Sequence, residues 1–88
     1  MKYTVTWKPE AHRRLTELWT DAPDRTAISA ATNEIDKRLG SNPLDEGESR
    51  DAGRRILLVS PLGVFFTVRD ADRLVEVIVV WRYPLRDS

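Results

Sequence analysis

The sequence predicts an α+β fold with an N-terminal strand, a helical hairpin and then a three-stranded antiparallel meander, both helices packing on one face of the sheet. Three patterns support this order. A short alternating segment opens the chain, two segments with helical periodicity follow, and three apolar segments separated by turns close it. Because 88 residues is the size of one small domain, we expect residues 1–88 to fold as a single unit.

The first half of the chain supplies the first strand and the two helices. Residues 3–7 alternate aromatic or branched side chains with threonine, which is the period of a strand. Pro9 suits the first turn of one helix, Asp24 is a good N-cap for the next, and Gly40 is predicted to end it. Apolar positions at three- and four-residue steps give each helix one buried face, with Ala11, Leu15, Leu18 and Trp19 in the first and Ile28, Ala31, Ile35 and Leu39 in the second.

A polar, acidic stretch over residues 40–53 has no periodicity, and we expect it to form a long loop. The meander strands are then predicted over residues 55–59, 64–69 and 74–82. The last of these is apolar on both faces, so we expect it to lie inside a four-stranded sheet, beside residues 3–7.

The register of the meander follows from keeping one face apolar. A two-residue loop at 71–72 does so, and Trp81 then lies at the end of the helix-covered face. The predicted pairs are Val68 with Val75, Phe66 with Val77, Val64 with Val79, Val64 with Val59 and Phe66 with Leu57.

The opposite, open face of the predicted sheet carries both arginines and apolar side chains. We predict on it Arg54, Ile56, Leu58, Phe65, Thr67, Arg69, Glu76, Ile78, Val80 and Arg82. A small monomer rarely exposes so much apolar surface. We therefore expect a partner protein to bind through Ile56, Leu58, Phe65, Ile78 and Val80, and a homodimer that buries the same face is the rival interpretation.

Composition excludes several classes of function. Fourteen basic and fourteen acidic residues give zero net charge, so no global positive field attracts nucleic acid or membrane. The absence of cysteine excludes disulfides, a thiol nucleophile and cysteine-ligated zinc, and one histidine excludes a histidine-rich metal centre. No apolar run approaches the roughly 20 residues that span a bilayer. We expect a cytoplasmic protein that needs no cofactor and no metal.

The order of four short segments carries a family resemblance. These segments are the opening strand and acidic helix start at 3–11, the helix end and loop at 39–44, and the closing hairpin at 64–70 and 75–82. Together they resemble the RelE/ParE superfamily of toxins from bacterial type II toxin–antitoxin modules, over roughly residues 2–83. Where RNase members carry an arginine entering the second meander strand, this chain has Gly63 or Val64.

The resemblance implies a toxin held inactive by a cognate antitoxin. RelE-like members cleave mRNA on the ribosome, and ParE-like members inhibit DNA gyrase. The leading hypothesis is RelE-like cleavage by a metal-independent endoribonuclease. The alternatives are gyrase inhibition and a catalytically inactive antitoxin-binding module. The expected partners are therefore the antitoxin and either the ribosome with mRNA or gyrase, and no membrane.

Arg54, Arg69, Arg82 and Tyr83 form the candidate catalytic set. Arginines can hold a scissile phosphate through paired N–H donors, and a tyrosine can act as acid, base or stacking platform. The alternative is that the arginines are solvated strand residues or bind antitoxin carboxylates, and that Tyr83 packs at the sheet edge. His12 is more typical of a helix surface than of a catalytic site. Turn chemistry and solvation account for the acids at 45–51, 70 and 72.

Overall fold

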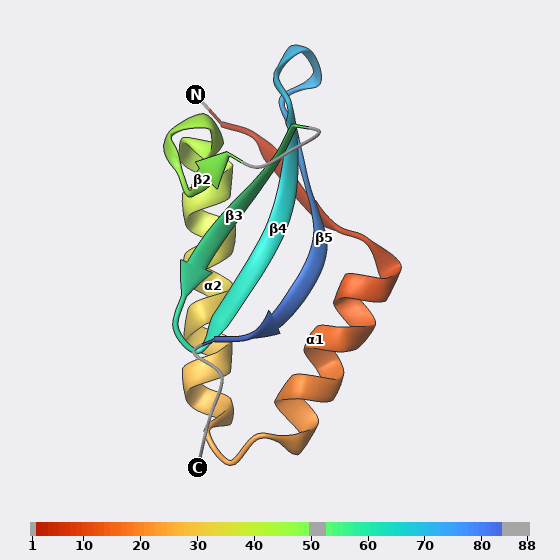
Figure 1. Ribbon diagram of the computed structural model, residues 1–88, viewed down its shortest axis with the longest axis vertical. Coiled ribbons are helices and arrows are strands. Elements are labelled where there is room, and N and C mark those ends of the chain that lie inside the picture. Colours follow the sequence, from red (N-terminus) through yellow and green to blue (C-terminus); the bar gives the residue numbers. More distant parts are fainter. Residues whose placement is uncertain (1, 50–52, 84–88) are drawn as a thin grey trace.

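The computed structural model describes residues 2–49 and 53–83 (Figure 1). It confirms the predicted α+β order. The helices are α1 (Pro9–Asp21) and α2 (Arg25–Ser41), and the strands are β1 (Thr4–Trp7), β2 (Glu48–Ser49), β3 (Arg54–Val59), β4 (Leu62–Arg69) and β5 (Leu74–Arg82). Short 3-10 turns at Pro43–Asp45 and Asp70–Asp72 complete the described elements.

The sheet has five strands in the order β1-β5-β4-β3-β2, where four were predicted. Strand β1 pairs in parallel with β5, as expected, and the other neighbours are antiparallel. The additional strand, β2, lies inside the segment that was predicted to be a loop. In Figure 1 the sheet lies in front of α2, so one face is covered by the helices and the other is open.

The core lies between the sheet and the two helices. Sheet residues at alternating positions meet the predicted apolar face of α2, whose four apolar residues are all buried. The fully buried side chains include Phe66, Val64, Val75 and Val77 from the sheet and Ile28, Ile35 and Leu39 from α2. Burying each such side chain stabilises the fold by about 1.5–3 kcal/mol, which makes this layer the main source of stability.

The ends of α2 differ from the prediction at both sides. Asp24 occupies the N-cap position, but its side chain makes no capping hydrogen bond. Gly40 does not end the helix, which continues to Ser41. The Gly40 carbonyl instead accepts a hydrogen bond of 2.8 Å from the Tyr3 amide. The Tyr3 amide thus satisfies one of the carbonyls that the end of the helix leaves without an intrahelical partner.

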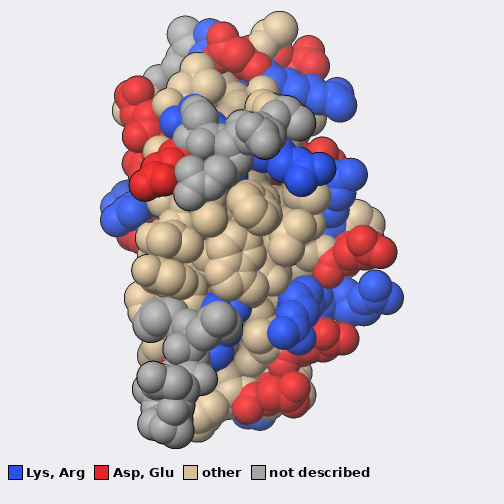
Figure 2. All heavy atoms as spheres, viewed as in Figure 1, with Lys and Arg blue, Asp and Glu red and all other residues tan. Residues whose placement is uncertain are grey.

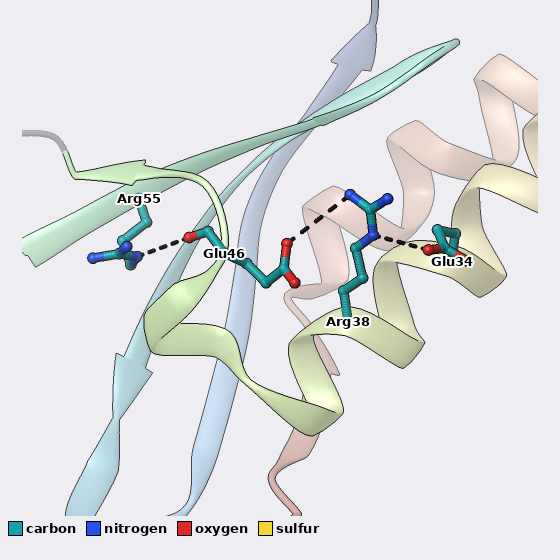
Figure 3. A network of polar contacts seen from close by, with 4 residues as sticks. All are labelled: Glu34, Arg38, Glu46 and Arg55. Atoms are coloured by element: carbon teal, nitrogen blue, oxygen red, sulfur yellow. Dashed lines mark hydrogen bonds and ion pairs between the residues drawn. The ribbon is translucent and has the colours of Figure 1, made fainter.

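Polar contacts hold the segment between α2 and β3 against the rest of the molecule (Figure 3). Arg38 on α2 binds Glu34 at 2.8 Å and lies 3.9 Å from Glu46, while the Arg55 side chain donates to the Glu46 carbonyl at 3.1 Å. Gly47 has φ +69, and its backbone passes directly against β3. These contacts explain how a stretch without periodicity is ordered over its described part.

Candidate functional site on the open face of the sheet

The pairing of β4 with β5 decides which side chains reach the open face. The predicted pairs Val68–Val75 and Phe66–Val77 are confirmed. A β-bulge then adds one residue to β5, so Val64 pairs with Val80 and the predicted Val64–Val79 pair is wrong. An extra residue on one strand reverses the facing of every later position as counted by simple alternation. The predicted faces are therefore wrong for the end of β5.

The pairing of β3 with β4 also differs from the prediction, without changing the faces. Val64 pairs with Leu57, and Val59 pairs with Leu62, so the connection is a two-residue turn at Ser60–Pro61. The Ser60–Pro61 peptide bond is cis. The slip relative to the predicted register is two residues, and a slip of two leaves each side chain on its original face.

The bulge corrects three predicted positions. Val80 is 2% exposed and belongs to the core, whereas Val79 is 44% exposed and takes its place on the open face. Trp81 pairs with Gly63 on the open side, although it was predicted under the helices. Arg82 pairs with the buried Leu62 and so points to the helix side, away from the open face.

Two rows of apolar residues, which we call the apolar half, cover the end of the open face near the β3–β4 turn. One row is Leu58, Gly63 and Trp81, and the next is Ile56, Phe65 and the bulge pair Ile78 and Val79. Figure 2 shows this region as a broad uncharged surface with charged side chains at its margins. The rings of Phe65 and Trp81 are 5.1 Å apart and tilted by 52°.

Two further rows, which we call the polar half, continue the open face toward the β4–β5 turn. Arg54, Thr67 and Glu76 lie side by side on β3, β4 and β5, and Arg69 follows two positions after Thr67. Strand spacing puts the Arg54 and Glu76 backbones about 10 Å apart. Within the described part of the chain, Arg54, Arg69 and Glu76 make no side-chain hydrogen bond or ion pair.

Glu76 was placed on this face by the sequence but was not chosen as a candidate. The signal that could have identified it is its position as the only charged residue in the apolar run 74–81. A carboxylate and two guanidinium groups around one hydroxyl residue can act as a base and as a binding site for a phosphate.

Arg82 and Tyr83 lie at the opposite end of the sheet from Arg69. Because Arg82 pairs with the first residue of β4 and Arg69 is its last, about 23 Å of strand separates them. Arg82 forms an ion pair of 2.7 Å with Asp24 at the α1–α2 junction, beside a concavity of about 450 Å³. The exposed Tyr83 donates its amide to the Pro61 carbonyl at 2.7 Å. The four predicted catalytic residues therefore do not form one cluster.

A second polar group joins β1 to the β4–β5 turn. The Tyr3 hydroxyl donates to the Asp70 carboxylate, and the Arg73 guanidinium lies 5.5 Å from the centre of the Tyr3 ring. The hydrogen bond to Asp70 is the main reason that the pKa of Tyr3 is raised above 10.0. These contacts join β1 to the β4–β5 turn at one end of the sheet, and they are not part of the open face.

The described residues hold no group of three or more His, Cys, Asp or Glu side chains able to bind a metal ion. None of the described helices is long and apolar enough to cross a membrane. His12 is exposed on α1.

Solved structures with the same architecture were found by structural comparison. The toxin–antitoxin complex RelBE2 from Mycobacterium tuberculosis matches with a TM-score of 0.73 at 21% identity, covering 93% of this chain and 92% of the other. The chromosomal ParDE system from P. aeruginosa matches at 0.69 and 16%, covering 92% and 96%. Isolated E. coli RelE toxin matches at 0.68 and 16%, covering 97% and 88%.

The chain has the RelE/ParE toxin fold. No protein-family model matches the sequence, and no curated protein matches it. Both RelE and ParE proteins share the fold at similar scores, so the fold by itself does not select between their activities.

Proposed function

We propose that this chain is the toxin of a type II toxin–antitoxin module and that a cognate antitoxin binds its open face. The RelE/ParE fold supports the first part, because the structures that share it are described as toxins and as toxin–antitoxin complexes. The apolar half supports the second part. Leu58 and Val79 are 42% and 44% exposed there, next to the Phe65 and Trp81 rings, and a partner would remove this surface from water.

The proposed antitoxin contacts keep four of the five predicted residues, namely Ile56, Leu58, Phe65 and Ile78. Val79 and Trp81 replace Val80, because the bulge turns Val80 into the core. Val79→Asp should abolish co-purification with the antitoxin encoded beside this gene, since a carboxylate in an apolar contact is left unpaired. Thr4→Asp, at an exposed edge-strand position of the same sheet, is the matched control and should keep the antitoxin bound.

For the activity, we propose metal-independent cleavage of mRNA by the polar half. The observation that carries this is the placement of Arg54, Arg69 and Glu76 around Thr67 without partners among the described residues. Glu76 would take the proton of a ribose 2′-hydroxyl, whose oxygen then bonds to the adjacent phosphorus while the 5′-oxygen leaves with a proton from water. The two guanidinium groups would stabilise the negative charge that develops on the phosphate oxygens.

This proposal revises the catalytic set. Arg54 and Arg69 remain in it, and Glu76 joins it. Arg82 is removed because its guanidinium is held by Asp24 on the other side of the sheet. Tyr83 stays a prediction outside this set, since it follows the end of β5 that lies away from Glu76.

The test is induced expression followed by primer extension on a reporter mRNA. We expect codon-positioned cuts that Glu76→Gln reduces by about 10²–10⁴-fold, as loss of a general base does. Arg54→Ala should also reduce them, whereas Arg82→Ala and the helix-surface control Arg13→Ala should leave them. Uncut mRNA together with loss of DNA supercoiling would instead establish ParE-like gyrase inhibition. Normal growth with neither effect would indicate an inactive antitoxin-binding module.

A further inference from the structure

We infer that the open face is self-complementary, so that two copies of this chain pack face to face when no antitoxin is bound. The two halves of the face carry the argument. One half is apolar, and the other presents a positive and a negative side chain on opposite sides of β4. For one two-fold rotation, the apolar half of one copy contacts the apolar half of the other, and the opposite charges face each other.

The rotation axis runs along β4, in the plane between the two copies. It exchanges the β3 side of one copy with the β5 side of the other. The apolar half then covers the apolar half, with Leu58 over the partner's Trp81 and Phe65 over the partner's Phe65. In the polar half, Arg54 faces the partner's Glu76, and the pair occurs twice because the interface is symmetric.

The other two-fold axis in the plane, which runs across the strands, does not work. It would place the apolar half of each copy on the polar half of the other and bury Arg54 and Glu76 against hydrocarbon. Aligned face-to-face packing is also the usual arrangement of two twisted sheets, with about 10 Å between them. Both axes keep the sheets aligned, so the match of apolar with apolar half is what selects the axis along β4.

Arg54 and Glu76 are suited to this contact because neither has a side-chain partner within the described part of the chain. Phe65 and Trp81 are fixed before association, since their rings already contact each other and Trp81 lies on Gly63. Aromatic side chains held in this way lose little rotational freedom on binding. The interface therefore has a rigid apolar end and a charged end.

The contact area makes the dimer weak and reversible. Three strands about 14 Å wide and about 23 Å long give a footprint of roughly 300 Å² on each copy. Because side chains make the accessible surface larger than this flat footprint, the two copies together bury on the order of 1,000 Å² of accessible surface. This is the low end of the range for specific interfaces. We expect a dissociation constant in the micromolar range. Arg69 weakens the dimer further, because it lies near the axis and faces the partner's Arg69.

The dimer would cover the polar half and the apolar half together. RNA and antitoxin could then bind only the monomer, so the dimer would be an inactive form of the free toxin. That consequence rests on the proposed function, whereas the dimer itself does not. A chain that dimerises without cutting mRNA would refute the proposed activity alone, and a chain that cuts mRNA but never dimerises would refute this inference alone.

Sedimentation equilibrium of the full chain across the micromolar range tests the inference through a charge exchange. Arg54→Glu and Glu76→Arg should each weaken the dimer about tenfold or more, because each creates two like-charge contacts. The double variant should return to within about threefold of the original, since the pairs re-form with reversed signs. Arg69→Ala should tighten the dimer, and the helix-surface control Arg13→Glu should not change it.

A second measurement does not depend on affinities. The chain has no cysteine, so Thr67→Cys introduces a single thiol on β4, close to the proposed axis. A short bismaleimide should join two copies through it, while the same reagent should leave Lys37→Cys on α2 uncoupled. A monomer at every concentration, a double charge variant as weak as the single ones, or equal cross-linking at both positions would each overturn the inference.

Discussion

Gly63 lets the indole of Trp81 lie flat on the open face, and Gly63→Ala is the sharpest test of this packing. A methyl group on Gly63 would lie 2.7 to 2.9 Å from three ring atoms of Trp81. These distances are well inside the contact distance of carbon atoms, which is about 3.5–4.0 Å. Since Phe65 lies against the same ring at 5.1 Å, the indole has little room to move aside.

The expected magnitude follows from two opposing terms. Overpacking by one methyl group costs about 1–3 kcal/mol of unfolding free energy. Alanine in a strand stabilises the fold by about 0.5–1 kcal/mol relative to glycine, because the unfolded chain with alanine has less conformational entropy to lose on folding. The net expectation is a loss of up to about 2.5 kcal/mol. In a Trp81→Ala background only the second term remains, so the same substitution should stabilise the protein by about 0.5–1 kcal/mol.

Urea unfolding followed by far-UV circular dichroism measures all four members of this double-mutant cycle. The protein concentration is kept low enough that the chain is monomeric. The coupling energy between the two sites should be about 1–3 kcal/mol. An equal effect of Gly63→Ala in both backgrounds would show that the indole does not lie over this glycine, and the register of β4 with β5 beyond the bulge would then be wrong.

Three other predictions test local features of the fold. Gly47→Ala should lower the free energy of unfolding, measured in urea, by more than about 2 kcal/mol, because the new Cβ would lie 2.0 Å from a β3 carbonyl oxygen. Gly53 has a similar φ of +72, but a Cβ there would meet nothing within 4 Å. Gly53→Ala should therefore cost only about 1–2 kcal/mol. Val80→Asp should prevent folding while Val79→Asp leaves the circular dichroism spectrum unchanged, and the reverse would refute the bulge. The hydrogen bond of Tyr3 should contribute fully to the free energy of unfolding below the unfolded tyrosine pKa of about 10, and this contribution should be lost as the pH rises through the raised pKa of Tyr3. If Tyr3→Phe lost the same amount of unfolding free energy over this pH range, the prediction would be wrong.

The sequence predicts both helices and the buried face of α2 well, because their signal is repeated over several turns. The predicted buried face of α1 is wrong in part, since Ala11 is buried but Trp19 is 41% exposed. Each apolar position predicted for α2, from Ile28 to Leu39, is buried. Strand β2 could not be found in this way, since two residues cannot show a period. Gly40 misled the prediction because a glycine ends a helix by taking a positive φ, and only Gly47 and Gly53 do so among the described glycines.

The candidate site was predicted less well than the fold, since it depends on counting along a single strand. Arg54 and Arg69 precede the bulge in the pairing, and both lie on the open face as expected. Arg82 follows it and lies on the other side. Glu76 also lies on the predicted face, but a single carboxylate in an apolar strand does not by itself indicate a catalytic role.

The bulge itself can be explained from the residues that flank it. Residues 77–80 are four β-branched apolar side chains, so strict alternation and a bulged strand would give equally apolar core faces there. Strict alternation would pair Trp81 with Leu62 inside the core and leave Val80 over Gly63. The bulge instead puts Val80 opposite Val64 and Arg82 opposite Leu62, and it brings the indole out over the one residue of β4 that has no side chain. The same change turns Arg82 toward Asp24, so the fit of Trp81 to Gly63 decides which charged residues the open face presents.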